Sequence, residues 1–103
     1  MKRVLLISVL LLSCAAIASA QSGGKNIFMS KCSICHGPDG SGKTSMGKTL
    51  NIADLHSAAV KQMSDAELKT VITNGKNKMP PFKGKLTDAQ IDQVISYIRE
   101  LQK

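Results

Sequence analysis

Five consecutive residues, Cys32-Ser33-Ile34-Cys35-His36, constrain this chain more than any other feature of its sequence. Two cysteines lie three residues apart, and a histidine directly follows the second. A disulfide between these cysteines would close a very small loop and add little stability. The chain has only 103 residues. Because a domain this small has a thin apolar core, it needs a staple, that is, a stabilising cross-link, of another kind.

The same five residues form the sequence that attaches a c-type haem. Two thiols at this spacing can add to the two vinyl groups of haem and form thioether bonds, for which we expect Cys32 and Cys35. The adjacent imidazole of His36 is then placed beneath the iron. The covalent links also supply the missing staple, so one covalently bound haem c is the expected cofactor.

Two other uses of the motif are disfavoured. A redox-active dithiol is expected on a βαβ scaffold, and the chain has no segment with sustained strand alternation. A structural zinc site needs four ligands, but only His56 remains as a further nitrogen donor and there is no second cysteine pair.

The first twenty residues read as a separate unit. Lys2 and Arg3 precede an apolar run, and Ala18-Ser19-Ala20 offers a small-residue cleavage site, which together indicate a secretory signal peptide. We therefore expect a cleaved signal peptide at 1–20 and a single domain at 21–103, located in the periplasm. An uncleaved membrane anchor, or lipidation of Cys14, is the alternative.

The remaining residues carry twelve Lys and Arg against seven Asp and Glu, a net charge of +5. A surplus of this size suits acidic protein surfaces, although it also serves solubility. Nucleic acid is not an expected partner, because the lysines are scattered and aromatic stacking platforms are absent.

Helical periodicity accounts for most of this domain, so the expected fold class is all-α. Ser64 and Thr87 each begin a capping box, and Gly75 is expected to end the helix that follows Ser64. Gly24 shares a helix face with Phe28, which predicts that another backbone passes close by. Two expected helices span approximately 22–32 and 57–63, a third starts at Ser64 and is stopped by Gly75, and the last begins at the Thr87 capping box and reaches Leu101. A surface loop is expected at 37–51, tied down by Met46 and Leu50.

A second axial ligand for the iron must come from elsewhere in the chain. Met79 is the favoured candidate, because Pro80 and Pro81 hold it in an extended, stiffened loop between two helices. A thioether ligand suits ferrous iron and raises the reduction potential relative to a second histidine. Among the other candidates, Met29 is only three residues before Cys32 and too close to reach the opposite face of the ring. Met46 and Met63 are interpreted as packing residues, and His56 as an exposed residue at a helix start.

With these motifs in place, the chain resembles the class I monohaem cytochromes c, particularly the short soluble bacterial and photosynthetic kind. The resemblance rests on Cys32-x-x-Cys35-His36-Gly37, on Met79-Pro80-Pro81-Phe82 and on a last helix containing Tyr97. It implies a small fold in which the first and last helices cross, with loops and a middle helix wrapping the haem. Gly24 and Phe28 would then meet Val94 and Tyr97.

The resemblance also implies a function, that of a single-electron carrier between periplasmic or membrane redox partners rather than an enzyme. The electrons would pass through a partly exposed haem edge, and no catalytic residues carry over. Acidic patches on the partner proteins would dock against lysines of this chain, such as Lys43, Lys76, Lys78, Lys83 and Lys85. The carrier is expected to be a monomer.

Two features depart from the family pattern. Many relatives have a proline whose carbonyl holds the ligand histidine, but 40–51 contains none and Pro38 follows His36 closely. The group that orients His36 Nδ1 is therefore open. The haem propionate partners are also open, with Lys43, Lys48 and Thr49 as the loop residues to inspect.

Two functions from other classes compete with electron transfer. A gas-binding or sensory haem protein would need an open sixth coordination site, and rapid carbon monoxide binding would reveal it. A haem enzyme such as a peroxidase is disfavoured, because no acid–base group is evident beside an open site.

Overall fold

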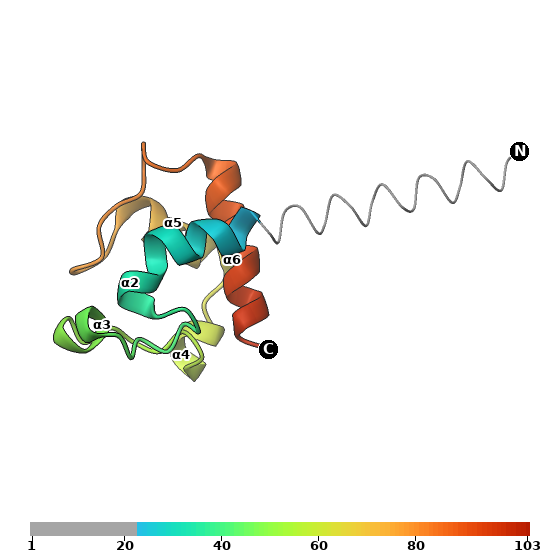
Figure 1. Cartoon of the computed structure of the whole chain (residues 1–103). Coiled ribbons are helices and arrows are strands. Elements are labelled where there is room, and N and C mark those ends of the chain that lie inside the picture. Colours follow the sequence, from blue (N-terminus) through green and yellow to red (C-terminus); the bar gives the residue numbers. More distant parts are fainter. Residues whose placement is uncertain (1–22) are drawn as a thin grey trace, which may run out of the picture.

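The computed structural model describes residues 23–103. The expectations for the signal peptide, for cleavage after Ala20, for Cys14 and for a cap at Ser22 fall outside this range. Within residues 23–103, every regular secondary-structure element is a helix. The only β-type pairings there are two isolated bridges, Lys76 with Met79 and Lys83 with Leu86. The predicted all-α class is confirmed (Figure 1).

The helices follow one another through short loops. Residues 23–27 are α-helical and continue without a break into a single π-helical turn, in which the Ser33 amide donates to the Phe28 carbonyl. The remaining bounds follow the chain: η1 (Phe28–Cys32), α2 (Ser33–His36), α3 (Ser45–Thr49), α4 (Ala58–Lys61), α5 (Asp65–Asn74) and α6 (Asp88–Leu101).

The two longest helices begin as the sequence predicts. Ser64 Oγ accepts from the Glu67 amide at 3.1 Å, and the Glu67 carboxylate accepts in return from the Ser64 amide at 3.4 Å. Thr87 and Gln90 make the same reciprocal pair at 3.1 and 2.9 Å. Gly75, with φ +76°, ends α5, a conformation that costs glycine little.

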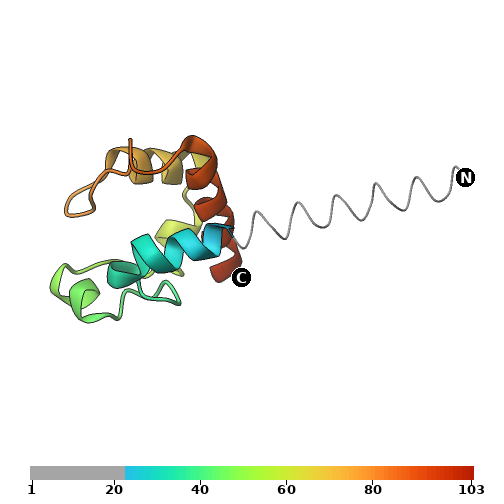
Figure 2. The same cartoon turned by 45° about the horizontal axis from the view of Figure 1, so that its top comes forward.

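The first helical segment crosses α6, as expected from Gly24. A Cβ atom at Gly24 would overlap the backbone carbonyl of Gln93, so only glycine allows this approach. One turn later, Phe28 is fully buried and its ring lies 5.4 Å from that of Tyr97 at an interplanar angle of 59°. Such a tilted pair contributes about 0.5–1.5 kcal/mol beyond its buried area. The crossing is visible in Figure 2.

The apolar core gathers around α6. Its inward stripe packs with residues from η1, α5 and the two neighbouring loops. The buried apolar residues are Phe28, Leu55, Leu68, Ile72, Phe82, Ile91, Val94, Ile95 and Ile98. This core leaves α3 and the loop at 75–86 projecting to the same side of the helix crossing, one opposite the other (Figures 1 and 2).

Three expectations need correction. The segment 37–51 is not all loop, because it contains α3, which is capped by Thr44 Oγ1 accepting from the Gly47 amide. Met46 is 44% exposed and does not tie the segment down, whereas Leu50 is half-buried. The short helix expected at 57–63 is a single turn, α4.

None of the helices in residues 23–103 has the length and apolar character needed to cross a bilayer.

Candidate functional site

The Cys32–His36 segment lies at the end of the first helical stretch. Cys32 closes η1, and α2 carries the next four residues to His36. A single π-turn at this place widens the helix directly before the motif, and such turns are frequent at functional sites. Gly37, with φ +83°, then ends α2 and lets its amide bond the Ser33 carbonyl at 2.8 Å.

The carbonyl groups at the end of α2 are held from the α3 side. Thr44 Oγ1 donates to the Ile34 carbonyl at 2.7 Å and lies 3.2 Å from that of Cys35. The Gly42 amide donates to the His36 carbonyl at 2.7 Å. A Cβ atom at Gly47 would overlap the carbonyl groups of Cys35 and Gly42. The motif is therefore positioned by close backbone contacts that need small residues.

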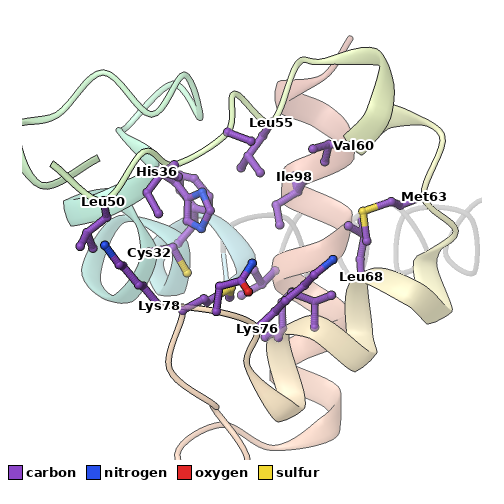
Figure 3. A pocket seen from close by; sticks show the side chains of 18 of the residues that line it. Cys32, His36, Leu50, Leu55, Val60, Met63, Leu68, Lys76, Lys78 and Ile98 are labelled. Atoms are coloured by element: carbon purple, nitrogen blue, oxygen red, sulfur yellow. The ribbon is translucent and has the colours of Figure 1, made fainter. Parts of the chain in front are cut away.

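A cavity of about 480 Å³ opens between this segment, α5, α6 and the loop that carries Met79. Its volume is in the range of small-molecule and cofactor sites. The lining is mostly apolar, and His36 and Cys32 face it from one side (Figure 3). The polar side chains of the lining, apart from Cys32 and His36, are Asn51, Lys76, Asn77 and Lys78.

His36 presents a neutral imidazole to this cavity. Burial lowers the pKa of the ring below its ordinary value, which favours the uncharged form that can bind a metal. Nδ1 is buried and has no hydrogen-bond partner among the described residues. The bond from a backbone carbonyl that many relatives have is thus not seen here, and Pro38 does not supply it.

The two cysteines differ in their surroundings. Cys32 lines the cavity, and burial together with the neighbouring Cys35 raises the pKa of its thiol to about 11. Cys35 is half-buried but is not among the residues lining the cavity. Neither cysteine forms a disulfide. Both thiols are therefore free to react, and of the two only that of Cys32 lines the cavity.

Met79 lines the same cavity from the opposite element. Its amide donates to the Lys76 carbonyl at 3.0 Å and its carbonyl accepts from the Lys76 amide at 3.2 Å, which closes a tight turn. Asn77 sits in this turn with φ +55°. Farther along, Phe82 is buried and its amide donates to the Ile72 carbonyl at 3.0 Å. The loop is therefore pinned to α5 after the prolines, as a rigid support for Met79 requires.

The other candidate ligands separate clearly. Met63 also lines the cavity, so among the described residues it is the one alternative thioether that shares this cavity with His36. Met29 and Met46 are not among the lining residues. His56 is directed to the Asp54 carboxylate, with Nδ1 and Oδ1 2.7 Å apart, and does not line the cavity either.

Sequence reasoning missed part of the polar lining. Lys43, Lys48 and Thr49 do not line the cavity, whereas Asn51 and Asn77 do. Both asparagines adopt a left-handed backbone, with φ of +56° and +55°. Asparagine tolerates the left-handed backbone better than most residues. An Asn next to an apolar or basic run was therefore the sequence signal that could have pointed to these two residues of the cavity lining.

The donor set fits a haem. A largely apolar cavity, a thiol at its edge, a half-buried imidazole and an opposing thioether match the needs of a flat, covalently held iron cofactor. Within the described residues, no group of three His, Cys, Asp or Glu side chains gathers in one place.

Comparison with known proteins gives a consistent result. Residues 19–98 match the family described as "Cytochrome C oxidase, cbb3-type, subunit III". Cytochrome c6 of Gloeothece citriformis is 40% identical over 86 residues, which cover 82% of this chain and 74% of the relative. Cytochrome c6 of Leptolyngbya boryana is 41% identical over 81 residues, covering 79% of this chain and 91% of the relative.

A solved structure shares the fold. The protein named KustC0563 c-type cytochrome superposes with a TM-score of 0.71 at 29% sequence identity, over 78% of this chain and 98% of that chain.

Proposed function

This chain belongs to the small class I monohaem cytochromes c, and we propose that it uses His36 and Met79 as the two axial ligands of its haem iron. As a member of this family it is an electron carrier with one covalently bound haem c, and not an enzyme. In the proposal, Cys32 and Cys35 form the thioether bonds.

One observation carries the ligand assignment. His36 and Met79 come from separate elements, 43 positions apart in the sequence, and both line the same apolar cavity. The histidine is fixed through the carbonyl contacts of α2, and the methionine through its turn and the attachment of its loop to α5. Two ligands held on rigid supports keep rearrangement small when the oxidation state changes.

When bound, the haem supplies an iron that cycles between the ferrous and ferric states. The residues of the chain have different tasks. The imidazole of His36 is kept neutral by burial, and the apolar lining limits the access of water. The neutral imidazole is the form that can bind iron, and the apolar lining favours the reduced form, because ferric iron gains more from a polar, hydrated site.

We propose that partner proteins dock near the attachment motif. Ile34 lies between the two cysteines and is 68% exposed, so it offers an apolar contact next to the cofactor edge. Exposed lysines surround the cavity on the Met79 loop, and Lys76 and Lys78 extend across it (Figure 3). Lys43, Lys83 and Lys85 are also exposed. These charges would steer an acidic partner surface toward the haem edge.

We further propose that residues 1–20 direct export and that the carrier works in the periplasm as a monomer. Support comes from the basic start, the apolar run and the small residues before Gln21. N-terminal sequencing or intact mass of the protein from a periplasmic fraction tests this, with a start at Gln21 as the expected result.

The ligand assignment is tested with oxidised and reduced visible spectra of wild type, Met79→Ala and Met63→Ala. Met63 is a matched control, because it is a methionine that lines the same cavity. We expect a far-red sulfur-to-iron band in the oxidised wild type that is lost in Met79→Ala and retained in Met63→Ala. Loss of the band only in Met63→Ala would move the ligand to Met63.

A second outcome would change the function itself. If the reduced wild type is high-spin, or binds carbon monoxide rapidly at neutral pH, the sixth coordination site is open and gas binding replaces electron transfer as the working function.

The docking proposal is tested by the salt dependence of electron exchange with an acidic redox partner. Raising the ionic strength should slow the reaction, because screening weakens long-range attraction. Lys78→Gln should reduce this dependence, and Lys103→Gln, at the far end of α6, should leave it unchanged. A rate independent of salt would remove the steering role.

A further inference from the structure

One wall of the cavity is built differently from the others. Leu55, Val60 and Met63 line it from the segment 55–63, which contains the single turn α4. The extensive packing between helices joins α5 with α6, and α2 with η1 and α3, but does not include α4. Val60 and Met63 are only partly buried against the core. The wall therefore needs another means of attachment.

Arg99, in the last turn of α6, supplies the first attachment. Its Nη2 donates to the Met63 carbonyl at 2.5 Å, its Nε to Asp65 Oδ1 at 2.9 Å and its Nη1 to Gln102 Oε1 at 2.9 Å. The side chain is 27% exposed, so these bonds are partly shielded from water. A guanidinium can satisfy three acceptors in fixed directions, which a lysine cannot.

Gln102 supplies the second attachment at the other end of the wall. Its Nε2 donates to the Leu55 carbonyl at 2.8 Å, and the Leu55 amide donates to the Gly40 carbonyl at 2.8 Å. Gly40 lies four residues after His36, so this chain of hydrogen bonds runs from the end of α6 through the wall to the loop that follows the Cys32–His36 motif. Among the described residues, the backbone of 56–63 makes no backbone hydrogen bond to another helix.

We propose that Arg99 and Gln102 are positioning residues that form a two-point latch, holding the wall at 55–63 closed over the haem. The inference rests on the proposed function only in assigning the cavity to haem. The latch keeps Leu55, Val60 and Met63 against the cofactor and keeps water out. Opening it would hydrate the site and favour ferric iron, and the reduction potential would fall.

The test uses the haem-loaded protein in four forms: wild type, Arg99→Gln, Gln102→Ala and Lys103→Gln. Lys103 is a matched control, since it is a cation at the same helix end that pairs only with the exposed Glu100. Amide hydrogen exchange and the midpoint potential are measured for each. The amides of the wall that donate backbone hydrogen bonds are those of Leu55, Ser57, Lys61, Gln62 and Met63.

We expect the wall amides of Arg99→Gln to exchange about tenfold to a hundredfold faster, because a hydrogen bond to a charged group is lost. Those of α6 should change far less, and the potential should fall. Gln102→Ala should show the same pattern more weakly and concentrated at Leu55, so the test survives if Arg99→Gln folds poorly. Lys103→Gln should match the wild type.

Two results would overturn the latch. In the first, exchange rises equally along α5, α6 and the wall, which makes Arg99 a contributor to global stability alone. In the second, the potential and the wall exchange of both variants match those of Lys103→Gln. Neither result would affect the assignment of the axial ligands, because the visible spectrum of each variant tests that assignment separately. A further variant, Asp65→Asn, removes the ion pair between Arg99 and α5 but keeps the hydrogen bond from Arg99 to the Met63 carbonyl, so it should leave the wall closed.

Discussion

The attachment region, 33–55, and the helical pair of α5 and α6 obtain their order in different ways. Both helices of the pair have complete capping boxes, and α6 has a buried apolar stripe. The attachment region has two short helices, and three of its glycines adopt positive φ. It is held by backbone contacts around Gly42, Thr44 and Gly47.

The difference shows where the cofactor contributes stability. The helical pair needs no cofactor for its order, because the polypeptide itself supplies both the helix caps and the apolar core. The attachment region instead directs His36 and Leu50 toward a cavity, and His36 Nδ1 has no hydrogen-bond partner among the described residues. Its apolar surface is fully covered only when the haem fills that cavity. The helical pair is thus a scaffold, and the attachment region a holder completed by its ligand.

Removal of the haem should give the largest effect. A Cys32→Ser/Cys35→Ser double variant cannot form thioether bonds, so the chain is obtained without covalent cofactor. We expect the amides of Gly42, Ile52 and Leu55 to exchange at least about tenfold faster than those of α6, when each is compared with the haem-loaded protein. Hydrogen exchange read by NMR checks this. A uniform loss of protection along the chain would remove the distinction between scaffold and holder.

Gly47→Ala should give the next largest effect. The new methyl group would overlap two backbone carbonyls, and the expected loss in the free energy of unfolding is about 1–3 kcal/mol. Gly84→Ala is the control, because Gly84 has φ +81° but no atom near a new Cβ, so only backbone strain of about 1 kcal/mol applies. Urea unfolding measures both. Equal losses would show that contact with the Cys35 carbonyl is unimportant.

Removing a helix cap should cost about 1 kcal/mol in either region. Thr44→Val and Ser64→Ala are therefore expected to lose similar unfolding free energy. Only Thr44→Val also releases the Ile34 carbonyl beside the attachment cysteines, so only it should lower the yield of covalently attached haem. Thr44→Ser should restore that yield. A lowered yield in Ser64→Ala as well would mean that attachment follows stability and not the local contact.

The smallest effect concerns acid. Hydrogen bonds from the His56 amide and ring lower the pKa of Asp54 below its ordinary value. A lowered carboxyl pKa gives stability that is present above the ordinary value of about 4 and is lost as the pH falls through the lowered pKa. Asp54→Asn should therefore flatten the decline of stability below about pH 4. Urea unfolding at several pH values checks this, and an unchanged slope would contradict it.

Much of the scaffold could be predicted because its signals are local. Ser64 and Thr87 begin α5 and α6 through side chains within three residues, and Gly75 ends α5 by its own conformational freedom. Gly24 was also informative, since a glycine on an apolar helix face needs a reason, and here the reason is the Gln93 carbonyl. The place of Met79 in a loop between α5 and α6 could also be predicted, because two prolines follow it.

The holder was harder to read because its order comes from distant contacts. α3 escaped detection, since it is only five residues long and contains Gly47, which disfavours a helix but permits contact with Cys35. The π-turn at η1 has no counterpart in the apolar periodicity. The latch at Arg99 joins residues 36 positions apart, and no sequence pattern connects them.

The contact between Gly24 and Gln93 also sets an order of assembly. Because a polypeptide is made from its N-terminus, Cys32 and His36 exist well before the last helix does. The crossing that buries Phe28 cannot form until Gln93 and Tyr97 have been added. During synthesis the attachment segment is thus present before the helix crossing can form, and the crossing is completed only when the last helix docks.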